Sequence, residues 1–299
     1  MTLKPLMAAL TVVGVSTTVV AGAQAQDSRE SLVVSADWVA EHLNDDNLVL
    51  LHVGEDTAYQ SEHVPGAHFV SFMDIWHEDS HGGGDNLVLE LPEPDRFQTM
   101  LRGWGINDDS RIVVYWGSEW VTPAARTIFT LDWAGLGDRT VLMNGGIGAW
   151  KTAGHDVTTE VPRRGNGNVT VRPRDDLIVD AKWVQKYTTE PGYALVDARS
   201  QAVYDGIRET RGRAGHIPGA GATPWTEFID EEIMLRSAAE IEAVFAGAGV
   251  RDGDTVVVYC HIGQFATMAM FAARTLGYEV KLYDGAFQDW AQRDLPVER

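Results

Sequence analysis

Cysteine is almost absent from this sequence, since its 299 residues include only one, Cys260. One thiol cannot form a disulfide within the chain, and it cannot build a zinc or iron–sulfur site that needs several thiolates. The sequence also lacks a phosphate loop with Gly-Lys-Ser/Thr, a dinucleotide fingerprint and a Gly-x-Ser-x-Gly turn. We therefore expect no metal ion and no cofactor, and Cys260, if it has a role, acts as a single thiol.

Basic residues are scarce as well. Lys and Arg number 24 against 43 Asp and Glu, which gives a formal net charge of -19 and a sequence pI near 4.7. Such a charge repels phosphate backbones and anionic lipids. We therefore exclude nucleic acids and membrane surfaces as partners.

The sequence contains no apolar run long enough to span a membrane, which takes about 20 residues. Its one extended apolar run, Leu6 to Val20, follows Lys4 and leads into the small residues Ala21 to Ala25. This order is typical of a signal peptide, and a retained anchor is the alternative. We predict a signal peptide over residues 1–25, cleavage after Ala25, and a periplasmic or secreted protein.

Three motifs occur twice, in the same order. They are His63-Val64-Pro65-Gly66-Ala67 with His216-Ile217-Pro218-Gly219-Ala220, Ile112-Val113-Val114-Tyr115-Trp116 with Val256-Val257-Val258-Tyr259-Cys260, and Asn144-Gly145-Gly146-Ile147-Gly148-Ala149-Trp150 with Asp284-Gly285-Ala286-Phe287-Gln288-Asp289-Trp290. A period this long indicates two whole domains rather than a solenoid. We assign residues 26–162 to the first domain, 163–175 to a polar linker that contains glycine, and 176–299 to the second domain.

Short apolar runs alternate with helical patterns in both halves. The expected strands are Leu48–Val53, Arg111–Tyr115, Val141–Met143, Ala194–Asp197, Thr255–Tyr259 and Glu279–Tyr283. The expected helices are Pro123–Trp133, Ala238–Phe245 and Phe265–Leu276, the last of them ended by Gly277. Continuous β-branched runs of this length are typical of buried parallel strands. The pattern predicts an α/β fold in which each domain has a mainly parallel sheet flanked by helices.

Cys260 lies where an α/β sheet binds ligands. It ends a predicted strand, and six residues, His261 to Ala266, lead from it into a helix. Ligands bind outside the carboxyl ends of parallel strands, and N–H groups at the start of a helix lower a thiol pKa. The alternative is a buried cysteine that acts only as a small apolar side chain.

The repeated His-Pro-Gly turn, the strand-end Cys260 and the closing segment Tyr283 to Trp290 resemble the rhodanese family of sulfurtransferases, over the whole chain after residue 25. The resemblance implies that Cys260 accepts a sulfane sulfur as a persulfide and passes it to a thiol or cyanide. It also implies that the first domain is inactive, because Trp116 stands at the matching position. The loop residues His261, Gly263, Gln264 and Phe265 become candidate substrate-binding residues.

The second domain carries eight more residues than the first between the matching positions His52 to His63 and Asp197 to His216. This longer stretch contains Arg199, Arg208, Arg211 and Arg213, and its first-domain counterpart contains no arginine. Guanidinium groups bind small anions with paired hydrogen bonds. We expect Arg213 to bind the sulfur donor, and Arg199 either to bind it or to form an ion pair with Asp197.

We favour thiosulfate as the small anionic donor, because no Ser follows Cys260 as it does in mercaptopyruvate enzymes of the family. A 3-mercaptopyruvate sulfurtransferase and a noncatalytic sulfur-carrier or binding module are the alternatives, and a sulfur-relay protein is a further possible partner. A phosphatase on this fold needs an Arg six residues after the cysteine, where the chain has Ala266.

Overall fold

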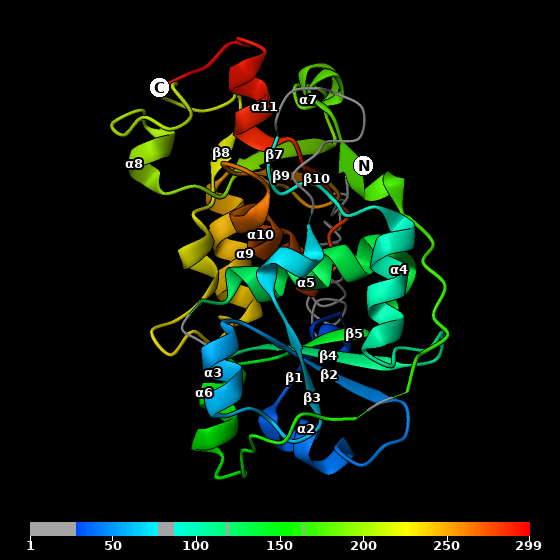
Figure 1. The fold of residues 1–299 in the computed structure, drawn as a ribbon. Coiled ribbons are helices and arrows are strands. Elements are labelled where there is room, and N and C mark those ends of the chain that lie inside the picture. The colour runs from blue at the N-terminus through cyan, green and yellow to red at the C-terminus, as the bar shows by residue number, and fades with distance from the viewer. Residues whose placement is uncertain (1–27, 77–86, 118–119, 164) are drawn as a thin grey trace, which may run out of the picture.

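The computed structural model describes residues 28–76, 87–117, 120–163 and 165–299. The predicted signal peptide lies outside these residues. The chain forms two five-stranded sheets, one in each half, and every strand pair in them is parallel. Helices flank both sheets, so the predicted α/β fold with two similar domains is confirmed (Figure 1).

The first domain contains the sheet with strand order β1-β5-β4-β2-β3. Its strands are β1 (Val33–Val34), β2 (Leu48–Val53), β3 (Ala67–Val70), β4 (Arg111–Trp116) and β5 (Thr140–Met143). Its helices are α2 (Ala36–His42), α3 (Asp56–Ser61), α4 (Pro94–Gly103), α5 (Thr122–Leu131) and α6 (Gly146–Thr152), with short turns η1 (Phe72–Ile75), η2 (Asp132–Leu136) and η3 (Gly137–Arg139).

The second domain repeats this order as β6-β10-β9-β7-β8. Its strands are β6 (Ile178–Val179), β7 (Tyr193–Asp197), β8 (Gly221–Ala222), β9 (Thr255–Tyr259) and β10 (Val280–Tyr283). Its helices are α7 (Ala181–Tyr187), α8 (Gln201–Tyr204), α9 (Ala238–Gly247), α10 (Gln264–Thr275) and α11 (Ala286–Gln292), with short turns η4 (Asp175–Leu177) and η5 (Trp225–Phe228). The observed strands and helices lie within a few residues of the predicted ones.

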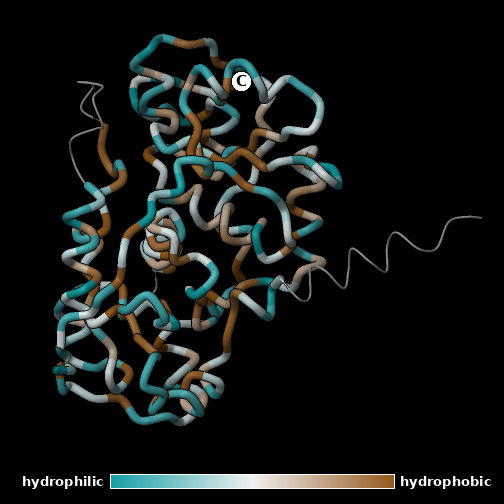
Figure 2. The backbone as a smooth tube through the Cα atoms, turned by 90° about the vertical axis from the view of Figure 1, so that its right-hand side faces the viewer, coloured by the Kyte–Doolittle hydropathy of each residue, from teal (hydrophilic) through white to brown (hydrophobic). Residues whose placement is uncertain are grey.

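The central strand of each sheet is buried on both faces, as its unbroken apolar sequence predicts. Hydrophobic and hydrophilic stretches alternate along the backbone in both halves (Figure 2). Because successive side chains of a strand point to opposite faces, alternate residues enter different cores. One core belongs to each domain alone, and the third is shared between the two domains.

Helices α5 and α10 form the centre of the shared core, and both lie between the two sheets in Figure 1. Every residue of α5 is buried, including its polar residues Thr122, Arg126, Thr127 and Thr130. At one end of the pair, Arg274 of α10 forms a 2.6 Å ion pair with Asp132, which directly follows α5. The two domains therefore meet through a largely apolar interface, with a partly buried ion pair at this end.

The predicted linker packs along the first domain in the part that the structure describes. The N–H of Gly167 donates to the carbonyl of Arg102 at 2.7 Å, and the N–H of Val169 donates to the carbonyl of Ile106 at 3.2 Å. A β-carbon at Gly167 would lie 1.9 Å from the Ile106 oxygen, so only glycine fits there. The polar composition of this segment does not predict such docking, because backbone groups make these contacts.

Candidate functional site

Cys260 directly follows β9, the central strand of the second sheet. The alternation along this strand sends Val256, Val258 and Cys260 into the shared core, whereas Val257 and Tyr259 face the other side of the sheet. Cys260 is fully buried. The strand therefore directs the thiol toward α10 and the first domain.

A tight loop surrounds the sulfur of Cys260 with hydrogen-bond donors. Gly263 has a φ of +89°, which turns the chain back toward the cysteine immediately before α10 begins at Gln264. Four backbone N–H groups act on the sulfur, and they belong to Ile262, Gly263, Phe265 and Ala266. We call this loop, residues 260–266, the cysteine cradle. Converging N–H groups of this kind stabilise an anionic sulfur.

The pKa of the Cys260 thiol differs from the expected one. Burial raises the pKa of Cys260, and the four N–H groups of the cradle lower it by less than burial raises it. The expected lowering of the thiol pKa is therefore not found in this structure. The cradle offers its donors to an anion, but desolvation of the buried sulfur outweighs them.

The third repeated motif, Asp284–Trp290, packs against the cradle and holds its backbone. The N–H of Phe287 donates to the carbonyl of Cys260 at 2.9 Å, and the N–H of Gln288 donates to the carbonyl of His261 at 3.1 Å. Ala286, at the start of α11, adopts a φ of +53°, and Gly146 adopts +54° at the matching place in the first domain. The closing motif therefore fixes the course of the chain after the cysteine.

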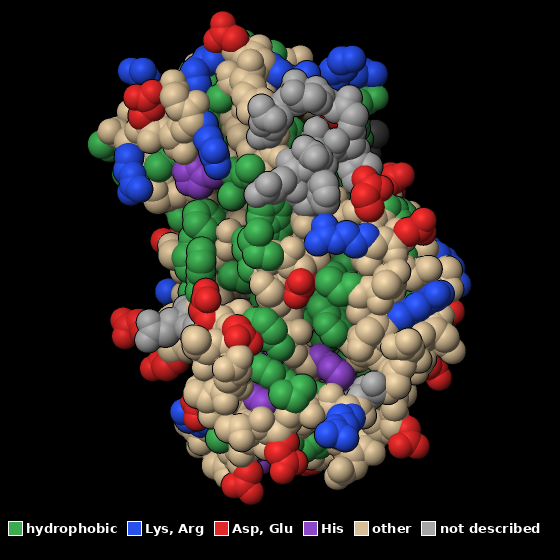
Figure 3. Space-filling model, in the orientation of Figure 1, with side chains coloured by type: hydrophobic (Ala, Val, Ile, Leu, Met, Phe, Trp, Pro, Cys, Tyr) green, Lys and Arg blue, Asp and Glu red, His purple; other side chains and the backbone are tan. Residues whose placement is uncertain are grey.

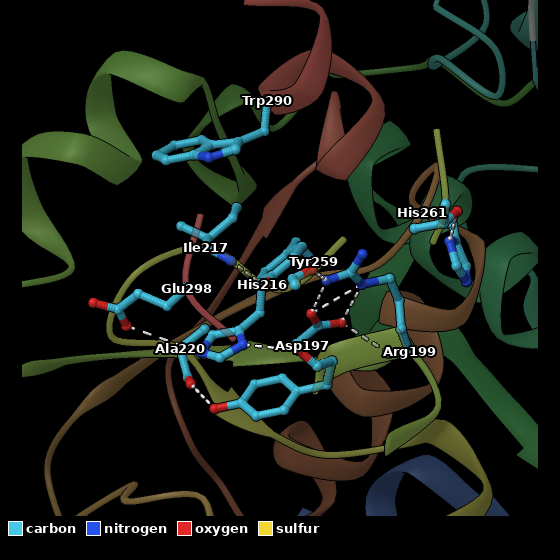
Figure 4. A network of polar contacts seen from close by, with 12 residues as sticks. Asp197, Arg199, His216, Ile217, Ala220, Tyr259, His261, Trp290 and Glu298 are labelled. Carbon is cyan, nitrogen blue, oxygen red and sulfur yellow. Dashed lines mark hydrogen bonds and ion pairs between the residues drawn. The ribbon is translucent and has the colours of Figure 1, made fainter. Parts of the chain in front are cut away.

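Arg199 is fully buried and pairs with Asp197 (Figure 4). Its Nε donates to both carboxylate oxygens of Asp197 at 2.9 Å, and its Nη2 donates to Asp197 and to the carbonyl of Gly215. Its Nη1 has no hydrogen-bond partner in the described part of the chain. The guanidinium also lies 4.0 Å from the centre of the Phe287 ring. Arg199 thus forms the ion pair that the sequence allowed, and one N–H-bearing nitrogen stays available.

His261, the second residue of the cradle, shares a 2.8 Å hydrogen bond between its Nδ1 and the Oγ1 of Thr210. Burial first, and then the positive charge of Arg199, lower the pKa of His261 to about 4. The charges of Arg208 and Arg211 act on it in the same direction. His261 is therefore neutral at physiological pH and can offer one N–H or one lone pair to a ligand.

The other candidate residues, Phe265, Gln264 and Arg213, contact different parts of the protein. The ring of Phe265 meets His261 edge-on, with 5.9 Å between ring centres. The side-chain amide of Gln264 is buried and donates to Thr122 Oγ1 in the first domain at 3.0 Å. Arg213 pairs with Asp294 at 2.6 Å and donates to the carbonyl of Leu295. Both side chains thus have hydrogen-bond partners within the protein. That Gln264 and Arg213 bind the sulfur donor stays a prediction.

The first domain carries no nucleophile at the matching place. Trp116 ends β4 and packs against the backbone of Gly146, where any β-carbon would lie 2.7 Å from the indole. His52 stands at the position of Asp197, and burial lowers its pKa to about 4. An indole and a neutral imidazole thus replace the thiol and the ion pair.

Sequence analysis missed the first-domain residues that contact the cradle. Thr122 binds Gln264, and Arg126 of α5 reaches the carbonyl of Gly263 and the carboxylate of Asp284. The one available signal was the polar stripe Thr122, Arg126 and Thr130 on one face of α5, but nothing in the sequence states which surface this helix faces.

These features define a two-domain α/β protein with one buried thiol at the carboxyl edge of its second sheet. The chain belongs to the rhodanese-like family, because the model of the rhodanese-like domain matches residues 35–153 and again 180–293. Among the described residues, no group of three metal-ligating side chains lies together, and no helix is long and apolar enough to cross a membrane.

Three relatives illustrate the family. The sulfur carrier protein TtuD of Thermus thermophilus is 33% identical over 87% of this chain and 93% of its own length. A putative thiosulfate sulfurtransferase of Haloferax volcanii is 31% identical over 91% and 98%. The crystal structure of SseA from Escherichia coli, a 3-mercaptopyruvate enzyme by its description, has a TM-score of 0.74 and 28% identity, with 86% and 98% of the two chains covered.

Proposed function

We propose that this sulfurtransferase carries a sulfane sulfur as a persulfide on Cys260, with thiosulfate as the favoured donor and a thiol or cyanide as the acceptor. The observation that carries the proposal is the cradle, in which four backbone N–H groups converge on the only cysteine of the chain. Such donors stabilise the charge that develops on sulfur during transfer.

The proposed reaction has two displacements. The Cys260 thiolate attacks the outer sulfur of thiosulfate, the sulfur–sulfur bond of the donor breaks, and sulfite leaves with the electron pair. An acceptor thiolate or cyanide then attacks the terminal sulfur of the persulfide, and the Cys260 thiolate leaves. The thiol loses its proton to water before it attacks the donor, and the cradle then stabilises each anion in turn.

The charge around the cradle supports a small anionic donor. Arg208 and Arg211 are exposed and lie close enough to His261 to lower its pKa. On the face shown in Figure 3, basic side chains lie on the upper domain beside a band of hydrophobic side chains between the domains. A dianion gains most from such local positive charge on an acidic protein.

3-Mercaptopyruvate is the second candidate donor, because SseA is described as a 3-mercaptopyruvate enzyme. A carrier role for the persulfide, with a sulfur-relay protein as partner, is the third possibility, because TtuD is named a sulfur carrier protein. Steady turnover with each donor in the presence of cyanide or a small thiol separates these possibilities. A pure carrier would load sulfur once and give no turnover with small acceptors.

We also propose export to the periplasm or medium after removal of residues 1–25. The support is the order of one lysine, a short apolar run and small residues. The test is the mass of the protein recovered from the producing cell and from its periplasmic extract. A mature chain that begins at Gln26 in the extract supports export, and an uncleaved chain confined to the cytoplasm contradicts it.

A further inference from the structure

Arg126 is a fully buried arginine of the first domain that extends into the second. Its Nη1 donates to Asp284 Oδ1 at 2.6 Å and to the carbonyl of Gly263 at 3.4 Å. Its Nη2 donates to the carbonyl of Leu89, in its own domain, at 2.7 Å. The guanidinium therefore joins the first domain to the cradle and to the closing motif of the second domain at once.

Gly263 packs closely against the Arg126–Asp284 ion pair. A β-carbon at Gly263 would lie 2.9 Å from Asp284 Oδ1 and 3.0 Å from Arg126 Nη1. The N–H of Gly263 is one of the four that act on the Cys260 sulfur. The Arg126–Asp284 ion pair therefore helps to fix the position of Gly263, whose N–H donates to the Cys260 sulfur.

Two more first-domain contacts hold the same region. Gln264 donates to Thr122 Oγ1 at 3.0 Å, at the start of α10. The side chain of Gln288 in α11 donates to the carbonyl of Val88 at 2.8 Å and accepts from its N–H at 3.2 Å. The first domain thus contacts α10, which begins in the cradle, and α11, which packs against it, and Arg126 supplies the charge among these contacts.

We infer that Arg126 is a positioning residue for the cysteine cradle, through which the inactive domain sets the shape and the charge around Cys260. Its effect on sulfur transfer depends on the function proposed above, but its effect on the thiol does not. Arg126 neutralises Asp284 beneath Gly263 and holds the Gly263 carbonyl. Without it, a carboxylate beneath the cradle opposes a second negative charge on Cys260.

The titratable groups that face the pair come from several elements. Glu90 of the first domain is buried, and burial followed by the charge of Asp284 raises its pKa to about 8. Asp289 of α11 is also buried and pairs with Arg293 at 2.6 Å. Below pH 8 Glu90 is therefore uncharged, and Arg126 faces Asp284 as its charged partner.

The test is a pH titration of the Cys260 thiolate by its ultraviolet absorbance, with the matching Cys260→Ser protein subtracted. Since the chain has one cysteine, the difference reports that thiol alone. Arg126→Met should move the midpoint upward by about 0.5 to 1 pH unit, and Arg126→Lys should move it less. Asp284→Asn should move it downward, because the guanidinium then stays uncompensated.

The matched control is Arg274→Met, which removes a second interdomain ion pair, the partly buried one with Asp132. Arg274→Met should lower the thermal midpoint as Arg126→Met does but leave the thiol midpoint unchanged. Equal thiol shifts for both arginine variants, or shifts of the same sign for Arg126→Met and Asp284→Asn, would overturn the proposal and assign Arg126 a structural role only. The titration needs no sulfur donor, so a protein that forms no persulfide would contradict the proposed function and leave this inference intact.

Discussion

Trp116 and Cys260 occupy the same place in the two domains: each stands at the end of the central strand of its sheet, and each side chain enters the shared core. The fold therefore offers two equivalent places for a nucleophile and fills only one of them with sulfur.

We predict that a thiol at the first place is not sufficient for activity. Trp116→Cys in a Cys260→Ser background should give less than about 1% of wild-type turnover, because the first domain lacks the arginine-bearing segment and a charged pair at His52. Steady-state assays with thiosulfate and cyanide measure this. Turnover near that of the wild type would show that the surrounding charge does not matter.

The Arg199–Asp197 pair should be important for folding. Arg199→Met leaves the buried Asp197 carboxylate without its partner, so the free energy of unfolding should fall by about 3 to 5 kcal/mol. Urea denaturation gives this value, and Arg213→Met, which breaks a partly exposed pair, is the control. A loss below 1 kcal/mol for Arg199→Met, with strongly impaired sulfur transfer, would instead assign Arg199 to the substrate.

Arg208 and Arg211 should attract the donor more than Arg213 does. Each Ala variant of the two exposed arginines should raise the KM for thiosulfate about threefold to tenfold and weaken its dependence on salt, because screening acts over about 10 Å at 0.1 M ionic strength. Arg213→Ala should change KM less than twofold, since Asp294 already pairs with it. A larger effect for Arg213→Ala than for the other two would restore it as the donor-binding residue.

Glu90 should make the protein less stable as pH rises. Its pKa is near 8 in the folded protein and ordinary in the unfolded chain, so between about pH 4.5 and 8 the folded state binds more protons. Its contribution to stability then falls by up to about 1.4 kcal/mol per pH unit. Glu90→Gln should match the wild type near pH 4.5 and unfold at a higher temperature above pH 8.

The exposed Glu41→Gln is the control for the Glu90 measurement. It should leave the pH dependence of the melting temperature unchanged. If Glu90→Gln and the wild type lose stability in parallel between pH 5 and 8.5, another group causes the loss.

Much of the fold follows from the sequence alone. Unbroken apolar runs such as Thr255–Tyr259 predict buried strands, and the paired motifs predict two similar domains. The strand-end position of Cys260 predicts the cradle and its glycine turn. These features are local, since a strand period or a turn residue determines each of them within a few positions.

The contacts between domains could not be predicted in this way. Arg126 reaches Gly263 across 137 positions of the chain, and Gln288 reaches Val88 across 200. No spacing rule links such residues, because their meeting depends on how α5 and α11 pack. The thiol pKa also departs from expectation, because full burial of Cys260 raises it by more than the loop N–H groups lower it, and the extent of burial depends on tertiary packing.

The most direct test of the proposed function is the intact mass of the protein after incubation with thiosulfate, measured with and without reductant. We predict a gain of one sulfur atom per chain that reductant removes and that Cys260→Ser abolishes, followed by release of that sulfur as thiocyanate when cyanide is added. Absence of this adduct with both thiosulfate and 3-mercaptopyruvate, or its persistence in Cys260→Ser, would contradict sulfur transfer through Cys260.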